Sequence, residues 1–174
     1  MTGNLIPCAD FELVLASLDS QAYTTMKSLF DPPVKQELLD RVQKVTEKSQ
    51  RQWGKMTPDQ MLSHINMSLS YPLGDVTVKF GRSPGFKQKL LRWFTLTPIP
   101  IPKAKAETLP EYKREGHYDI PAEKAKFTGL LERFVVKDKN APWSPSPVFG
   151  ELDAEEWGKI LYKHTDHHLK QFGV

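Results

Sequence analysis

The sequence has only one cysteine, Cys8, among its 174 residues, so no disulfide can form within the chain. Such sparing use of cysteine is typical of proteins in reducing compartments, and we therefore expect a cytoplasmic protein. Nothing near Cys8 predicts a lowered thiol pKa, which makes it a weak candidate for a nucleophile.

Long apolar runs are also lacking. The chain contains no stretch of about 18 consecutive apolar residues, which a transmembrane helix would need. Asp10 and Glu12 interrupt the first apolar stretch, and no basic segment precedes it, so it does not resemble a secretory signal. We therefore expect no membrane partner.

Charge of one sign is not in large excess. The 24 Lys and Arg residues are nearly balanced by 21 Asp and Glu residues, and they form no continuous basic run. We therefore expect no nucleic-acid partner. Hydrophobic residues make up 39% of the chain and charged residues 26%, which is ordinary for a globular protein. The length predicts one domain over residues 1–174.

What the sequence does contain is helical periodicity, which predicts an all-α protein. Asp31 and two prolines precede a predicted helix over residues 34–53. Thr57, Pro58 and Gln60 form a capping box at the start of a second helix that ends near residue 72. Further helices are predicted over residues 122–136 and, from a second capping box, over residues 153–172. Four helices of this length favour a four-helix bundle.

The connection from residue 74 to residue 110 is long and rich in proline. We expect one or two helical turns at residues 86–94 and no regular helix at residues 97–102. Four aromatic residues make it too apolar for a purely solvated loop: Phe80, Phe86, Trp93 and Phe94. It could cover a hydrophobic substrate pocket as a fixed wall together with Trp157, form a homodimer contact, or merely cover the core.

Three of the five histidines lie close together near the end of the sequence. His164 and His168 are four residues apart, so a helix places them on one face, one turn apart. Trp157 and Leu161 share this stripe, so the two imidazoles should point into the protein. Buried imidazoles are costly unless they are hydrogen-bonded or bind a metal. His64, on the second predicted helix, is the best candidate for a third ligand.

Other interpretations of the same residues remain open. A His pair at this spacing also occurs as ordinary core or surface residues, with no metal. Thr165 stands where a zinc protease of the His-Glu-x-x-His type has its glutamate, and Asp166 should point to solvent. We expect His167 to be a polar neighbour of the site, and His117 to lie in a loop.

Two segments resemble the DinB/YfiT-like superfamily of metalloenzymes. These are the segments 56–64, ending in His64, and 164–171, which contains the His pair and Gln171. Members of this superfamily are four-helix bundles with one His on the second helix, a His-x-x-x-His pair on the last, and often a Gln three residues later. The terminal phrase up to residue 173 resembles an uncharacterised branch more closely. That branch has a His where this chain has Ser146.

The resemblance implies a divalent transition metal (Zn, Ni, Fe or Mn) bound by His64, His164 and His168. Gln60 and Gln171 would orient ligands or substrate. Characterised relatives include S-transferases that use low-molecular-weight thiols, so one hypothesis is a metal-dependent thiol S-transferase or hydrolase acting on a small molecule. The alternative is a non-catalytic metal- or ligand-binding protein. No carboxylate shares the histidine faces, which weakens hydrolysis more than thiol transfer.

Overall fold

The computed structural model describes residues 26–76, 85–103 and 114–174. All regular elements in these ranges are helices, which confirms the all-α prediction for the described part of the chain. They are α2 (Pro32–Lys44), α3 (Pro58–Ser70), α4 (Gly85–Thr95), α5 (Ile120–Val136) and α6 (Ala154–Gln171). An isolated antiparallel bridge joins Ser146 and Gly150. None of the described helices is long and apolar enough to cross a lipid bilayer.

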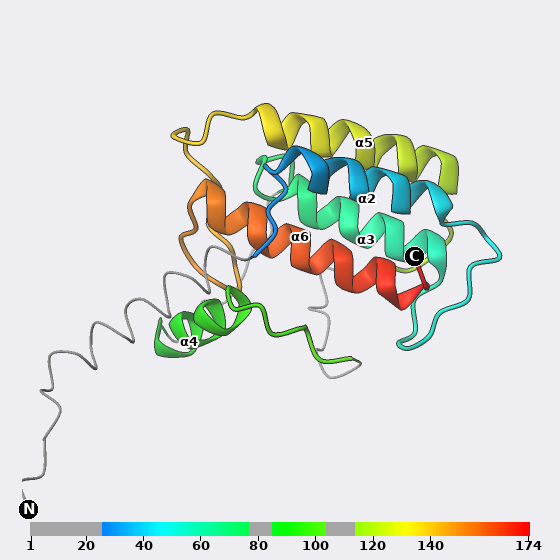
Figure 1. Cartoon of the computed structure of the whole chain (residues 1–174), viewed down its shortest axis with the longest axis horizontal. Helices are drawn as coiled ribbons and strands as arrows, with labels where there is room; N and C mark the ends of the chain where they lie inside the picture. Colours follow the sequence, from blue (N-terminus) through cyan, green and yellow to red (C-terminus); the bar gives the residue numbers. More distant parts are fainter. Residues whose placement is uncertain (1–25, 77–84, 104–113) are drawn as a thin grey trace, which may run out of the picture.

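Four of the helices pack around a common core (Figure 1). Both α2 and α3 contact α5 and α6. The core is made of the apolar side chains that the helical periodicity selects. The largest helical side chains with almost no exposed surface are Phe127, Phe134, Leu38, Met61, Leu62, Ile65, Leu69, Leu131 and Leu169. The shorter helix α4 lies outside this group, below α6 in Figure 1.

The start of α3 follows the predicted capping box. Thr57 occupies the N-cap, and its backbone N–H donates to Gln60 Oε1 at 3.1 Å. Asp59, in the first turn, is buried and accepts a hydrogen bond from the backbone N–H of Tyr118 at 2.9 Å. Burial alone would raise the pKa of Asp59, but the hydrogen bonds from Thr57 and Tyr118 hold it below its usual value. This contact ties the loop before α5 to the start of α3.

The predicted extent of the helix over residues 34–53 is wrong, because α2 ends at Lys44. Val45 keeps the apolar spacing and is fully buried, but its backbone is extended. The next residues form a local turn instead, in which Ser49 Oγ accepts from the N–H of Thr46 at 2.9 Å. A side-chain acceptor of this kind competes with helical hydrogen bonding. Residues 45–56 are therefore irregular.

The last helix agrees closely with its prediction. Asp153 is the N-cap of α6, and Glu156 completes the capping box. Phe172 is the C-cap, and Gly173 follows with φ of +73°, a conformation that favours glycine after a helix. The start of α5 at Ile120 is two residues earlier than predicted.

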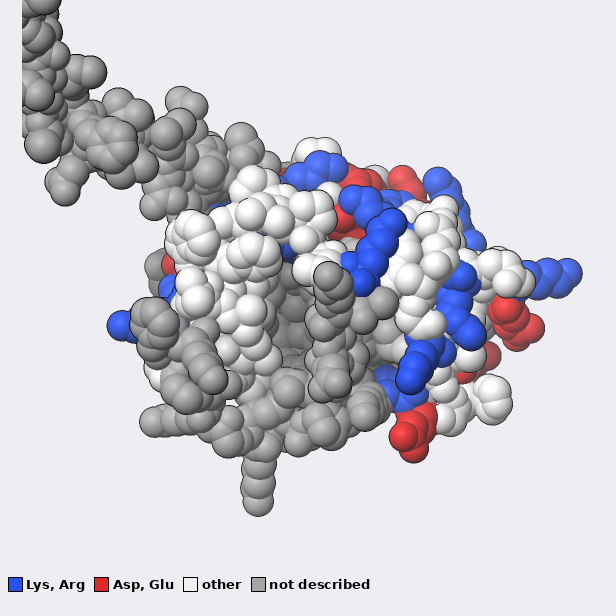
Figure 2. Space-filling model, turned by 90° about the horizontal axis from the view of Figure 1, so that it is seen from below, with Lys and Arg blue, Asp and Glu red and all other residues white. Residues whose placement is uncertain are grey.

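The connection between α3 and α5 holds more helix than predicted, since α4 has 11 residues. The Arg92 guanidinium binds the Glu156 carboxylate of α6, with an Nε–Oε1 distance of 2.9 Å. Lys163 Nζ donates to the backbone oxygens of Thr95 and Thr97, both at 2.9 Å. Residues 97–102 are not helical, as predicted. Figure 2 views the molecule from the side of α4. Phe80 lies outside the described residues.

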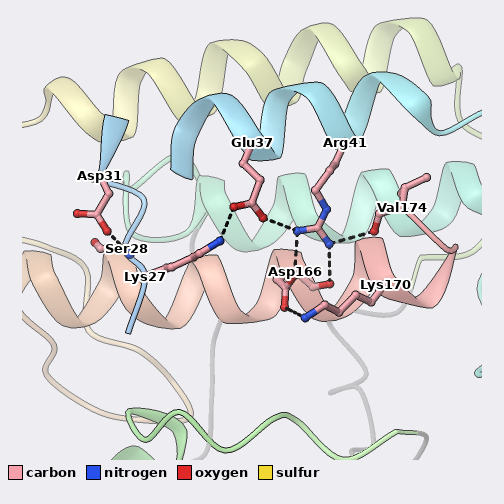
Figure 3. A network of polar contacts seen from close by, with 8 residues as sticks. All are labelled: Lys27, Ser28, Asp31, Glu37, Arg41, Asp166, Lys170 and Val174. Carbon is pink, nitrogen blue, oxygen red and sulfur yellow. Dashed lines mark hydrogen bonds and ion pairs between the residues drawn. The ribbon is translucent and has the colours of Figure 1, made fainter. Parts of the chain in front are cut away.

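An ionic network joins α2 to α6 (Figure 3). Arg41 Nη1 donates to Asp166 Oδ1 at 2.8 Å and to Glu37 Oε1 at 3.0 Å, and Nη2 donates to Val174 O at 3.0 Å. Lys170 also binds Asp166. Asp166 was expected to point to solvent, but its side chain is only 16% exposed because α2 supplies this partner. The network fixes α6 against α2.

Replacing Arg41 by alanine should lower the free energy of unfolding by about 1–3 kcal/mol, because a mostly buried carboxylate loses its main partner. Urea unfolding measures the change. Lys139→Ala is the matched control. It breaks an ion pair with Glu155 whose side chains are 51% and 50% exposed, and it should cost less than about 1 kcal/mol. Equal losses in the two variants would contradict this role for Arg41.

Candidate metal centre

Three histidine side chains meet between α3 and α6. His64 comes from the middle of α3, and His164 and His168 come from successive turns of α6. Their ring centroids are 4.6–4.9 Å apart. One ring nitrogen of each lies within 4.8 Å of the other two. The two helices thus bring together the three histidines singled out in the sequence.

The separation of the nitrogens fits a shared metal ion. Nε2 of His64 and Nε2 of His164 are 3.0 Å apart. Metal–nitrogen bonds of about 2.0–2.1 Å put neighbouring ligand nitrogens roughly 3.0–3.4 Å apart, depending on the bond angle. Without a metal, the same contact requires one Nε2 to carry a proton and the other to accept it. The observed distance therefore suits either two ligands of one ion or one hydrogen bond.

His168 is oriented by a short chain of hydrogen bonds. Gln171 Nε2 donates to the backbone oxygen of Trp53 at 2.7 Å. This leaves the Gln171 carbonyl oxygen facing His168 Nδ1, 3.0 Å away. An amide oxygen can only accept, so Nδ1 of His168 carries the proton and Nε2 presents its lone pair. A hydrogen bond of this kind to the remote nitrogen is typical of histidines that bind metals.

Burial keeps His164 and His168 uncharged. His64 and His168 are 4% and 9% exposed. Burial, together with the nearby His64, lowers the pKa of His168 to about 3. Burial and the neighbouring His168 also hold the pKa of His164 well below its usual value. These two imidazoles are therefore neutral near pH 7, which is the form that binds metals.

One polar atom of the cluster is unsatisfied. Nδ1 of His164 is buried and has no hydrogen-bond partner among the described residues. A buried nitrogen without a partner is costly, so the packing of α3 against α6 does not by itself compensate for burying this imidazole. Binding a cation through Nε2 would give the ring a strong interaction.

The chemistry of the ligands narrows the choice of ion. Within the described ranges, the cluster consists of imidazoles only. Imidazole suits Zn, Ni, Fe and Cu, whereas Mg and Ca prefer oxygen ligands. Three protein ligands leave at least one coordination position for a small molecule, as in catalytic metal sites.

Two of the predicted neighbours of the site lie nearby but serve other contacts. Gln60 is one turn before His64, and its Nε2 donates to Gly116 O at 3.2 Å. Its Oε1 accepts a hydrogen bond from the backbone N–H of Thr57. The side chain therefore connects the loop before α5 to the start of α3 and does not contact the histidines through these bonds. His167 packs its ring against Trp53, with centroids 5.7 Å apart, and against His168 at 5.2 Å.

Three other residues lie away from the cluster. Trp157 is two turns before His164 and packs in the core against Tyr71, with ring centroids 6.3 Å apart. Its role in a substrate pocket stays a prediction. His117 is almost fully exposed. Ser146 caps the turn before α6, where its Oγ accepts from the N–H of Phe149 at 3.1 Å. That turn precedes the first residue of α6, whereas the histidines lie in its second half.

The sequence interpretation missed the segment that supports His168. Trp53 supplies the carbonyl group that holds Gln171, and Gln52 N–H donates to the backbone oxygen of Gln171 at 2.8 Å. Gly54 approaches the same side chain closely. The overextended helix prediction hid these contacts. The one local signal was Gly54, which marks an irregular backbone.

The connection that carries α4 passes the histidine-bearing part of α6. Lys163, next to His164, binds the backbone of Thr95 and Thr97. Lys103 Nζ lies 4.6 Å from the ring centroid of Trp53. The described part of the connection therefore lies beside the histidine-bearing part of α6. A wall next to the metal centre requires this placement.

A protein-family model described as "Protein of unknown function (DUF1569)" matches residues 33–173, a range that includes all three histidines. No curated protein and no solved structure matches the chain at a significant level. The comparisons give a family without an activity, so the function has to be argued from the site.

Gly54→Ala should disturb the support of His168. A Cβ at residue 54 would lie 2.2 Å from Gln171 Nε2, and that amide can move only by giving up its contact with Trp53. The backbone is also left-handed there, with φ of +77°. We expect a loss of roughly 2–4 kcal/mol of stability in urea unfolding, combining the backbone cost and the overlap.

Gly116→Ala separates the two effects. Gly116 has φ of +97°, but a Cβ there meets no atom within 4 Å. It should therefore show only the backbone cost of about 1–2 kcal/mol. If the two variants lose the same stability, the close contact with Gln171 is not important.

Proposed function

The chain belongs to the DUF1569 family, and we propose that it is a metal-dependent enzyme whose metal is held by His64, His164 and His168. The convergence of three imidazoles from two helices, with one nitrogen of each within 4.8 Å of the others, is the observation that carries the proposal. The neutral state of His164 and His168 and the orientation of His168 by Gln171 support it.

The placement of the histidines favours a DinB/YfiT-like bundle. Among the four helices that pack together, α3 is the second and α6 is the last. His64 on α3 and the pair on α6 thus occupy the positions that the resemblance implies. Gln171 stands three residues after His168 and contacts it, which gives this feature of the superfamily a physical role here.

A bound Zn, Ni or Fe ion would act as a Lewis acid that lowers the pKa of a thiol or water ligand. The chain's own residues prepare the site for this. Gln171 fixes the tautomer of His168, and the buried surroundings keep His164 and His168 neutral. The α4 connection runs beside the histidine-bearing turns of α6 and would form one wall of the substrate site.

Thiol transfer fits the site better than hydrolysis. Among the described residues, no carboxylate belongs to the histidine cluster, so the site lacks an evident general base. A thiol needs no added base once its pKa is low enough. The proposed substrates are therefore a low-molecular-weight thiol and a small apolar electrophile.

A non-catalytic metal-binding protein is the second candidate. The same lack of an acid–base group favours it, since the histidine cluster could bind a metal for stability or sensing alone. The two candidates share the metal site and differ only in turnover.

Protein purified without an affinity tag should contain about one equivalent of a divalent transition metal. His64→Ala, His164→Ala and His168→Ala should each lose most of it, because two imidazoles bind far more weakly than three. Elemental analysis measures the content, and thermal melts with and without chelator measure the stabilisation that binding gives. His117→Ala is the matched control, since this side chain is 99% exposed and lies outside the cluster.

Unchanged metal content in the three cluster variants would overturn the proposed metal site.

A test of turnover separates the two candidate functions. The metal-loaded protein, a small thiol and an apolar alkylating agent are mixed, and thioether formation is followed by mass spectrometry. Formation that depends on His64 supports the enzyme, whereas a bound metal without thioether formation above the uncatalysed rate favours the non-catalytic protein.

A further inference from the structure

Within the described residues, the helix α4 contacts the rest of the protein through one side. Arg92 binds Glu156, and Leu96, just after the helix, is buried in the core. Lys163 holds the backbone of Thr95 and Thr97. These contacts attach the helix to α6 and determine which of its side chains remain outside.

The outer side of this segment is apolar. Leu90, Leu91 and Trp93 are 56%, 45% and 50% exposed, and Ile99 is 48% exposed. Among the described residues only one other large apolar side chain, Val136 on α5, is exposed. We call these four residues of the connection the α4 face. Figure 2 shows a largely uncharged surface in its left half, where α4 lies. Such a concentrated apolar patch is typical of an interaction site.

The sequence of the segment that carries the α4 face has charge of one sign only. Residues 85–103 include four basic residues and no acidic residue, and the acid-free stretch of sequence extends from residue 76 to residue 106 with seven basic residues. Because the whole chain carries +3, the remaining residues carry a net −4. Lys89 is exposed next to Leu90 in the sequence, whereas Lys103 is exposed but lies against Trp53, and Arg92 is paired with Glu156. The modest net charge therefore conceals a strongly basic segment.

We propose that the α4 face docks onto an anionic lipid surface. A short basic helix with exposed Leu and Trp side chains is suited to the membrane interface, where the apolar groups insert and the lysines meet lipid phosphates or carboxylates. Tryptophan in particular favours this interface. Docking would place α4 in the plane of the surface. Docking of this kind needs no membrane-spanning helix. The sequence predicted no membrane partner because it lacks such a span, and no described helix could form one.

Charge argues against the other occupants. A two-fold contact between copies of the chain would bring two basic segments together, which costs energy unless anions intervene. A single-stranded nucleic acid would meet the positive charge, but three of the four apolar side chains are aliphatic and offer no stacking surface. An anionic lipid surface satisfies both the apolar and the basic character.

Co-sedimentation of the full chain with vesicles tests the proposal. Vesicles of phosphatidylcholine with phosphatidylserine should bind the protein, while phosphatidylcholine alone should bind it more weakly. Binding should also fall as salt is raised. Leu90→Glu and Trp93→Glu should each weaken binding to the anionic vesicles at least about tenfold, and Lys89→Ala about fivefold.

Val136→Glu is the matched control, because it places the same charge on an exposed apolar residue of another helix; its binding should not change. Circular dichroism checks that each variant is folded. The proposal is overturned if anionic vesicles do not bind the protein, if neutral vesicles bind it equally well, or if Leu90→Glu behaves like Val136→Glu. It is also overturned if the protein is a stable dimer without lipid and Leu90→Glu dissociates it.

Discussion

Three imidazole nitrogens that face one another between α3 and α6 impose the main constraint on this structure. Nε2 of His64 and Nε2 of His164 are 3.0 Å apart, and burial disfavours a positive charge on His164. The interface between two packed helices is usually filled by apolar side chains, which need no hydrogen-bond partner. Here the packing brings ring nitrogens together instead, so the contact between His64 and His164 needs either a proton on one Nε2 or a shared cation.

The surroundings hold α6 in the orientation that this convergence needs. On the side of α2, Arg41 binds Asp166, which lies between the two histidines in sequence. On the other side, Gln171 connects His168 to the carbonyl of Trp53, and Lys163 anchors the α4 connection next to His164. Each turn of the second half of α6 thus has a polar contact to another segment, which limits rotation of the helix about its axis.

The parts of this account that depend on local physics could be predicted from the sequence. The capping boxes at Thr57 and Asp153 located the starts of α3 and α6, and the four-residue spacing put His164 and His168 on one face. The end of α2 could not be predicted, because the buried Val45 continues the helical period while a Thr46–Ser49 turn breaks it. Trp53 and Lys103 reach the site through tertiary contacts, of which their sequence positions give no sign.

X-ray absorption spectroscopy of the zinc-loaded protein tests the central claim most directly, because it reports the atoms bound to the metal. The account predicts one zinc per chain with three imidazole nitrogens at about 2.0–2.1 Å, recognised by multiple scattering from their rings, and one or two further oxygen ligands. His168→Ala should reduce the imidazole contribution by one. A zinc bound mainly by oxygen, or an imidazole count that His168→Ala leaves unchanged, would contradict a centre built from His64, His164 and His168.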